Sequence, residues 1–338
     1  MMRLPRFRYV APPSLAEAAA ALADLGTEAA VLAGGTDLFP NMKRRQQTPR
    51  TVVALRGIAA LRARAFDPGR GLTLGALTRL STIEHDRDLA AAYPALARAA
   101  SLVATPPIRN MGTIGGNLCL DTRCSYYDQS HEWRTSIDYC MKKEGEVCWV
   151  APGSKRCWAV SSSDTAPVLC ALGAEVTLTS KAGERRIAAS DLFADDGIAY
   201  LTRRPDEILS EVHLPAPADG ERSAYVKLRR RGSFDFPVLG VAVRARLSSA
   251  GVVEAARIFV GGAGSRPQEA RAAAESLVGK TLDDASIKTA AAQIAQIAKP
   301  MQNTDFHLSW RKSVAREYAA RALRELAGRG ADSPHARS

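Results

Sequence analysis

The sequence lacks any apolar run approaching the roughly 20 residues that a membrane-spanning helix needs. Its basic, alanine-rich start also fails as a signal peptide, because Glu17 and Asp24 interrupt the apolar residues. Ser14 and Glu17 have the spacing of a capping box, which predicts an ordinary helix from Ser14 to Leu25. We therefore expect a soluble, cytoplasmic protein that makes no membrane contact.

Acidic residues are scarcer than basic ones, with 35 Asp and Glu against 46 Lys and Arg in 338 residues, a net charge of +11. The basic residues are spread along the chain, and the densest runs are only Lys43–Arg45 and Arg229–Arg231. A solvated face or an acidic protein partner explains such runs as well as nucleic acid does. We expect no nucleic-acid binding. The length and the ordinary apolar content indicate two or three globular domains.

Cysteine is absent outside one stretch, where all six cysteines lie at positions 119, 124, 140, 148, 157 and 170. A disulfide framework suits small secreted domains, which this chain does not resemble. A structural zinc site usually has paired C-x2–4-C knuckles, whereas 15, 7 and 8 residues separate Cys124, Cys140, Cys148 and Cys157. An iron–sulfur cluster accepts irregular spacings. The spacing favours a cluster, and zinc or free thiols remain alternatives.

The residues around these cysteines also favour a cluster. Lys142, Lys143, Lys155 and Arg156 alternate with the thiols and would offset the negative charge of a thiolate-bound cluster. Aromatic side chains could keep water away from it, although plain packing explains them equally well. These aromatic residues are Trp133, Tyr139, Trp149 and Trp158.

Two glycine-rich loops are present where backbone amides could bind an anion. An expected strand at 29–33 runs into Gly34–Asp37, and Arg109–Asn117 reads RNMGTIGGN. Glycine lets consecutive N–H groups turn toward a ligand without a Cβ in the way, and a diphosphate is a natural guest. A glycine-rich surface turn is the alternative for either loop taken alone.

The remaining pattern predicts a small α/β unit over the first ~60 residues, then a mostly antiparallel sheet, then a further domain. The run 215–220, PAPADG, is the strongest linker signal and marks a domain boundary. The expected strands are 51–55, 71–77, 174–178, 187–188, 207–214, 224–229, 238–247 and 252–260. The expected helices are one from Pro40, 81–104 with a break at Pro94, 165–171, 267–277, 286–298 and 310–326.

Five motifs occur in an order that resembles a known family. They are LAGGTDL (32–38), IRNMGTIGGNL (108–118), SDTAPVLCALGAEV (163–176), RRR-x-x-x-DFPV (229–238) and FVGGAG-x-RP (259–267). Together they are similar to the FAD-binding subunit of the molybdenum hydroxylases, the xanthine dehydrogenase and carbon monoxide dehydrogenase family. The resemblance covers the whole chain except its tail.

The resemblance implies an α+β fold, with a p-cresol methylhydroxylase-type FAD-binding domain of two α/β subdomains and a C-terminal α/β domain. The expected domains are 1–216, with subdomains 1–60 and 61–216, and 217–328, followed by a disordered tail at 329–338. The two glycine loops would hold the FAD diphosphate, Asp164 would contact the ribityl or flavin region, and Ile208 and Lys227 would lie near the ring. The implied FAD contacts are Leu32, Ala33, Gly34, Gly35, Thr36, Asp37, Leu38, Val103, Met111, Gly112, Thr113, Ile114, Gly115, Gly116, Asn117, Asp164, Ile208 and Lys227. The alternatives are that Asp164 caps the following helix and that Lys227 is a solvated strand residue.

An insert at about 121–161 departs from most of this family and carries four of the six cysteines. It is similar to the insert in the β subunits of 4-hydroxybenzoyl-CoA reductases, which binds an additional [4Fe-4S] cluster, and Cys124, Cys140, Cys148 and Cys157 match its ligands. Cys119 and Cys170 lie outside the insert, and we interpret them as small buried residues.

That resemblance implies electron relay rather than substrate chemistry. Ferredoxin would reduce the cluster, and electrons would continue through FAD and a [2Fe-2S] small subunit to a molybdopterin-binding large subunit, in a dimer of heterotrimers. The reaction would be reductive dehydroxylation of 4-hydroxybenzoyl-CoA. The alternatives are an oxidative hydroxylase with the same insert and, more remotely, a zinc-stabilised nucleic-acid-binding protein.

Overall fold

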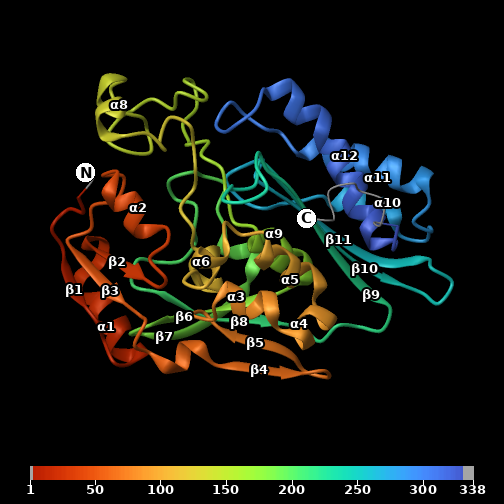
Figure 1. Cartoon of the computed structure of the whole chain (residues 1–338), viewed down its shortest axis with the longest axis horizontal. Helices are drawn as coiled ribbons and strands as arrows, with labels where there is room; N and C mark the ends of the chain where they lie inside the picture. Colours follow the sequence, from red (N-terminus) through yellow and green to blue (C-terminus); the bar gives the residue numbers. More distant parts are fainter. Residues whose placement is uncertain (1–2, 330–338) are drawn as a thin grey trace.

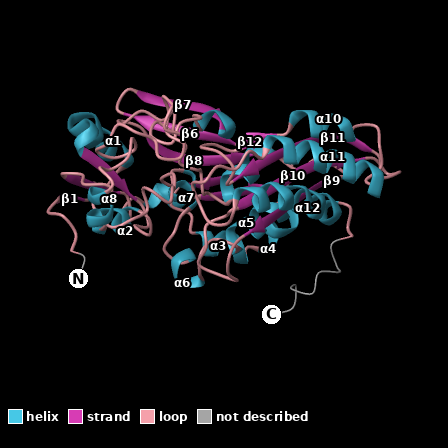
Figure 2. Cartoon of the chain, turned by 90° about the horizontal axis from the view of Figure 1, so that it is seen from above, coloured by secondary structure: helices cyan, strands magenta, loops and turns pink. Residues whose placement is uncertain are grey.

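The computed structural model describes residues 3–329, whose strands form three separate sheets (Figures 1 and 2). A 3-stranded sheet lies at the N-terminal end of the molecule, a 5-stranded sheet at the centre and a 4-stranded sheet at the other end. Helices cover all three sheets, so the expected α+β class is confirmed.

The N-terminal sheet is parallel, with the strand order β1-β3-β2. Its elements are β1 (Arg8–Val10), α1 (Leu15–Leu25), β2 (Ala29–Leu32), α2 (Leu38–Lys43) and β3 (Thr51–Ala54). The Ser14 hydroxyl accepts a hydrogen bond from the amide of Glu17 at 3.2 Å, which starts α1 as the capping-box spacing predicts. Leu22 of α1 packs with Val53 of β3 in one apolar cluster. At its carboxyl end, β2 leads into the Gly34–Asp37 loop.

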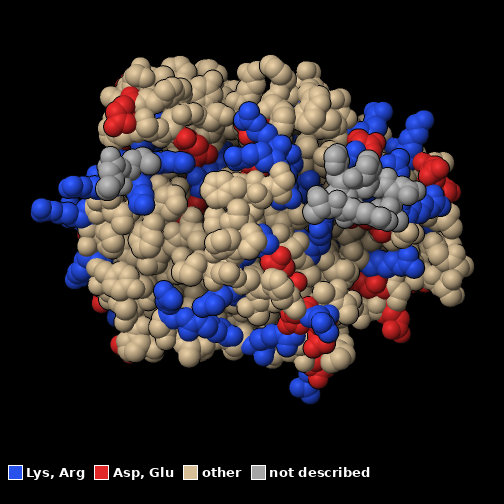
Figure 3. Space-filling model, viewed as in Figure 1, with Lys and Arg blue, Asp and Glu red and all other residues tan. Residues whose placement is uncertain are grey.

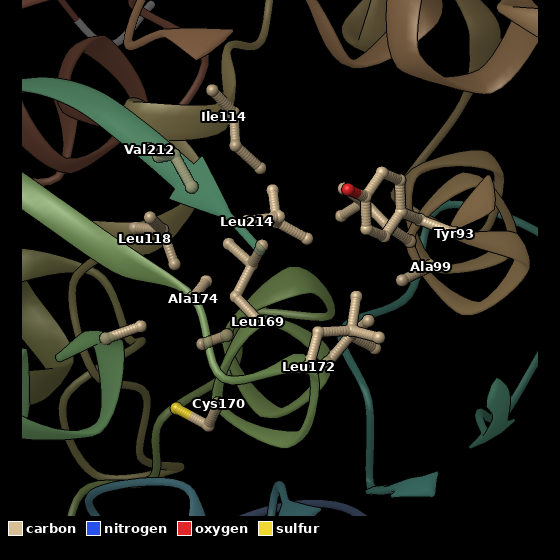
Figure 4. Packing of buried hydrophobic residues seen from close by; sticks show 14 of the residues in the cluster. Tyr93, Ala99, Ile114, Leu118, Leu169, Cys170, Leu172, Ala174, Val212 and Leu214 are labelled. Carbon is tan, nitrogen blue, oxygen red and sulfur yellow. The ribbon is translucent and has the colours of Figure 1, made fainter. Parts of the chain in front are cut away.

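The central sheet is antiparallel throughout, in the order β4-β5-β8-β6-β7. Its strands are β4 (Arg64–Asp67), β5 (Gly71–Gly75), β6 (Glu175–Ser180), β7 (Gly183–Ala188) and β8 (Ile208–Leu214). The larger helices that pack on it are α3 (Leu80–His85), α4 (Arg87–Ala92), α5 (Pro94–Ser101) and α9 (Thr165–Leu172). Figure 4 shows Leu169 of α9 beside Leu214 of β8 in the buried core.

The C-terminal sheet is buried on both faces. Its strands, in the antiparallel order β12-β11-β10-β9, are β9 (Glu221–Leu228), β10 (Leu239–Leu247), β11 (Val253–Gly261) and β12 (Gln268–Glu269). Along β10, Val241 and Val243 face the cluster that contains the helices α10 (Arg271–Leu277), α11 (Asp284–Ile297) and α12 (Leu308–Leu326). Ala242 between them faces the central core. This alternation fixes the C-terminal unit against the central one.

Short helices and turns fill the connections. They are α6 (Pro106–Arg109), α7 (Ile114–Leu118) and α8 (His131–Ser136), with 3₁₀ turns at Gly26–Glu28, Ala59–Arg62 and Ala189–Leu192. α6 and α7 flank the second glycine loop. α8 lies in the insert, which rises above the sheets in Figure 1.

Two expected helices differ from the structure. The segment 81–104 breaks at Asp86 as well as at Pro94, because the Asp86 carboxylate accepts from the amide of Leu89 at 3.0 Å and starts a new helix. The expected helix 267–277 begins only at Arg271, because residues 268–269 pair with β11 as the edge strand β12. Apart from Arg329, the expected tail lies outside the described residues. Within 3–329, no helix combines the length and the apolarity required to cross a bilayer.

Candidate functional site

The main candidate site is a cavity of about 610 Å³, which we call the large cavity. Both glycine loops line it, together with residues before β8 and in the turn after β9. Its volume lies within the roughly 300–1,000 Å³ typical of ligand sites. The residues expected at a flavin that line it are Leu32, Ala33, Gly34, Gly35, Thr36, Asp37, Leu38, Val103, Gly112, Thr113, Gly115, Gly116, Asn117, Asp164 and Ile208.

Three residues expected at the flavin do not line the large cavity. The Met111 side chain is 41% exposed to solvent. Ile114 is fully buried and points into the central core (Figure 4). Lys227 lies one layer behind the wall, hydrogen-bonded to Asp164. The glycine motif marks a contiguous loop at the large cavity, but the motif alone could not tell which of its side chains face that cavity.

The two glycine loops touch each other. A Cβ on Gly34 would overlap the carbonyl oxygen of Met111, and Gly35 has a φ of +75°, which L side chains rarely adopt. A Cβ on Gly115 would stand 2.7 Å from the Cβ of Ala76, which directly follows β5. These glycines are therefore required by backbone approach between protein segments, before any ligand is considered.

The loops differ in the amides they offer. Within residues 3–329, no backbone acceptor is hydrogen-bonded to the amides of Gly34, Gly35 or Thr36. In the second loop, Gly112 donates to the Ile108 carbonyl at 2.7 Å and Gly115 donates to the Ala76 carbonyl at 2.9 Å. The first loop therefore offers three consecutive amides to the diphosphate of the FAD that the resemblance implies. In the described part of the second loop, the Thr113 amide has no backbone acceptor and Gly116 donates only to Thr113 Oγ1 at 3.1 Å.

A buried ion pair forms part of the cavity wall. The Lys227 ammonium donates to Asp164 Oδ2 at 2.8 Å and to the carbonyls of Leu102 and Asp235, and the Tyr225 hydroxyl donates to Asp164 Oδ1 at 2.8 Å. Burial, the largest influence, lowers the pKa of Lys227 and raises that of Asp164, and each partner opposes the shift in the other. Three acceptors for three N–H groups stabilise a charged lysine there.

These contacts exclude both simpler interpretations of the pair. The Asp164 side chain makes no capping hydrogen bond to α9, and Ser163 Oγ instead accepts from the amide of Ala166 at 3.0 Å. The Lys227 side chain is only 1% exposed, so it is not a solvated strand residue. Asp164 is thereby held in a fixed position at the cavity.

Several lining residues were missed by the sequence analysis. Arg123 lines the large cavity, ion-pairs with Asp37 of the first glycine loop and lies 4.7 Å from the ring centre of Phe236. Burial raises the pKa of Asp37, and Arg123 opposes that shift. Asp121 and Tyr200 also line the cavity. The only sequence signal was the position of Asp121 and Arg123 just after the second glycine motif, which is where the insert was expected to begin.

A second, small cavity lies in the insert, and we call it the cysteine cavity. Cys124, Cys140, Cys148 and Cys157 all line it, and all four are buried. The remaining wall is apolar or aromatic apart from Lys142, and no carboxylate or histidine contributes to it. The structure thus brings together the four cysteines that were matched to cluster ligands.

The arrangement does not suit one metal ion. Among the described residues, no three Cys, His, Asp or Glu side chains are placed to share an ion. A zinc ion requires its ligands within about 2.0–2.3 Å of itself, whereas the iron and sulfide of a cluster separate its thiolates. Burial raises the pKa of Cys124 to about 12 and that of Cys157 to about 11, so a bound group would have to displace their protons. Four thiols with no carboxylate or histidine beside them are a donor set that iron–sulfur clusters use.

The remaining cysteines and the aromatic residues of the insert agree only in part with what the sequence predicts. None of the six cysteines forms a disulfide. Cys170 is buried in the central core as expected, but Cys119 is only half-buried and lines the large cavity. Trp149 lines the cysteine cavity and is 39% exposed, so it lies between the buried cysteines and solvent.

Several contacts attach the insert to the rest of the chain, and two of them lie at or just above its base. Arg123 and Val160 exchange backbone hydrogen bonds of 2.8 and 2.7 Å, which closes the base of the insert like the end of a hairpin. Asn303, from the loop before α12, donates to the Trp158 carbonyl at 2.6 Å and accepts from the amide of Ser125 at 2.9 Å. The C-terminal unit therefore holds both sides of the insert just above its base.

Two protein-family models together match nearly the whole chain. The model described as FAD binding domain in molybdopterin dehydrogenase matches residues 5–217. The model described as CO dehydrogenase flavoprotein C-terminal domain matches residues 223–326.

Individual relatives are similar over almost their full lengths. The carbon monoxide dehydrogenase medium chain of Afipia carboxidovorans is 30% identical, over 96% of this chain and 97% of that protein. The 6-hydroxypseudooxynicotine dehydrogenase complex subunit alpha of Paenarthrobacter nicotinovorans is 29% identical, over 95% of each. The structure of a carbon monoxide dehydrogenase from Hydrogenophaga pseudoflava superposes with a TM-score of 0.80 at 27% identity, covering 97% of this chain and 99% of that chain.

Proposed function

Because the chain belongs to the family of FAD-binding subunits of the molybdenum hydroxylases, we propose that it transfers electrons in an oxidative molybdenum hydroxylase. One observation carries this proposal. Most of the residues matched to FAD contacts come from distant parts of the sequence and yet line a single cavity. Bound FAD would supply both two-electron and one-electron transfer.

The residues of the large cavity have separate tasks in this proposal. The free amides of Gly34, Gly35 and Thr36 bind the diphosphate. Asp164, fixed by Lys227 and Tyr225, orients the flavin from the cavity wall. The chain itself carries out no substrate chemistry, so a molybdopterin-binding large subunit and a [2Fe-2S] small subunit are its proposed partners. A dimer of heterotrimers is the proposed assembly.

The names of the relatives support the oxidative direction, because they are dehydrogenases. The expectation that the complex reductively dehydroxylates 4-hydroxybenzoyl-CoA gains no support from these names. It therefore becomes the second candidate. The cysteine cavity favours it, since four buried thiols in the insert suit an extra [4Fe-4S] cluster through which ferredoxin would deliver electrons.

One experiment tests both candidates on the co-expressed complex. We expect flavin absorption bands in the purified complex, and a protein without flavin would contradict the assignment of the large cavity. Under anaerobic conditions, an oxidisable aldehyde or N-heterocycle should bleach the flavin of an oxidative enzyme. If instead 4-hydroxybenzoyl-CoA reoxidises the prereduced flavin, the reductive candidate is correct. Iron and sulfide analysis of the chain tests the cluster separately.

A further inference from the structure

The partition between the large cavity and the cysteine cavity contains a buried ion pair. Lys142 lines the cysteine cavity and Asp121 lines the large cavity. Their charged atoms, Lys142 Nζ and Asp121 Oδ1, are 2.8 Å apart, and the side chains are 6% and 4% exposed. The pair therefore spans the partition out of contact with bulk water.

Neighbouring groups hold the pair in place. Lys142 Nζ also donates to Thr122 Oγ1 at 2.8 Å and to the Gly197 carbonyl at 2.6 Å, so three acceptors fix it. The hydroxyl of Tyr127, a second residue that lines the cysteine cavity, donates to Asp121 Oδ2 at 3.0 Å. The Lys142 ammonium lies 5.2 Å from the ring centre of Tyr200, on the wall of the large cavity.

A buried pair of this kind affects what each cavity can hold. Among the described residues, Lys142 is the only basic one that lines the cysteine cavity. Charges separated from water act over longer distances than charges on a surface. A flavin and an iron–sulfur cluster both gain negative charge on reduction, so a fixed cation or anion in the wall shifts the potential at which each is reduced.

We propose that the Lys142–Asp121 pair electrostatically links the two cavities and sets the reduction potential of the flavin from the cysteine side. This inference rests on the proposed binding of FAD in the large cavity. Lys142 neutralises Asp121, so the flavin has no uncompensated anion on this wall. Lys142 also supplies the positive charge that favours a reduced, more negative group at the cysteines.

The two charges predict opposite shifts. Lys142→Met leaves Asp121 as an unpaired anion on the large cavity and should lower the midpoint potential of the flavin. Asp121→Asn keeps the shape of the side chain, leaves Lys142 unpaired and should raise that potential. The double variant should return toward the wild-type value. Lys142→Arg, which keeps the charge, should stay close to the wild type.

The test is a reductive titration of the full-length chain with its bound flavin, followed by flavin absorbance against a reference dye. Lys143→Met is the matched control, because Lys143 is the next residue, carries the same charge and pairs with Glu144 rather than Asp121. This control should leave the potential unchanged. If Lys142→Met does not fold, the test rests on Asp121→Asn alone. A rise in its flavin potential supports the inference, and a fall or no change contradicts it.

Unchanged flavin potentials in both single variants would overturn the inference, and so would shifts of the same sign, since a merely structural role moves both variants alike. A wild type without flavin would instead contradict the proposed function. If iron is present, Lys142→Met should also lower the potential of the iron–sulfur signal. The flavin titration requires no iron, so its outcome is independent of the cluster assignment.

Discussion

At the scale of single residues, Gly34 is where the two glycine loops approach each other most closely. Its Cα faces the Met111 carbonyl so closely that any Cβ would overlap that oxygen. Gly34→Ala should therefore force the two glycine loops apart and displace the free amides of the first loop. We expect the affinity for FAD to fall about tenfold or more, a loss of about 1.4 kcal/mol of binding free energy, and FAD occupancy to fall with it. Flavin absorbance per protein after gel filtration measures this.

Gly57 provides the control for that substitution. A Cβ on Gly57 would meet nothing within 4 Å, so Gly57→Ala adds a methyl group without displacing any segment. It should keep its FAD. Full occupancy in Gly34→Ala would show that the loops do not need this close approach.

At this scale, the features that could be predicted from the sequence are those that depend on neighbouring residues. The strand-to-glycine transition at Gly34 and the capping box at Ser14 each depend on a few neighbouring residues, and both were predicted. The lining residues Arg123 and Tyr200 were missed, because they reach the cavity only through the tertiary fold. The direction of Ile114 into the core was missed for the same reason.

At the scale of elements, the insert has a base closed by the backbone hydrogen bonds of Arg123 and Val160. The rest of the insert, its body, contains the four buried cysteines. The Arg123–Val160 pair closes the base without help from the cysteines. If a [4Fe-4S] cluster organises the body, Cys140→Ser should abolish iron binding and loosen residues 124–159, since metal binding and folding are coupled there. FAD should remain bound, because Asp121 and Arg123 lie at or below the base. Iron, sulfide and FAD analysis with limited proteolysis measures this.

Cys119→Ser is the matched control for that variant. Cys119 does not line the cysteine cavity, so its loss should leave iron unchanged. Zinc in the wild type, or wild-type iron in Cys140→Ser, would contradict the cluster.

The elements that were not predicted are short edge strands and the short helices and turns of the connections. β1, β4 and β12 each lie at the edge of a sheet and contain two to four residues. Their stability comes from pairing with residues elsewhere in the chain, as Tyr9 pairs with Val52, rather than from their own composition. The longer strands β9, β10 and β11 carry enough periodicity to be predicted within a few residues.

At the scale of the whole molecule, charge is distributed rather than concentrated. Figure 3 shows Lys and Arg in several groups separated by uncharged surface on the face in view. We expect the chain to co-purify with a molybdenum subunit and a [2Fe-2S] subunit when all three are co-expressed. Gel filtration that yields only the free chain would contradict this.

The hydrogen-bonded pair at the base of the insert has an evolutionary consequence. Two chain ends already joined by a backbone ladder can be connected by a two-residue turn or by a long segment, and each doubling of the segment costs only about 0.6 kcal/mol of closure entropy. A lineage could thus gain or lose the residues between Arg123 and Val160 in one genetic event while the flavoprotein beneath keeps folding. The cysteine-bearing segment can therefore be exchanged as one unit above a base that closes by itself.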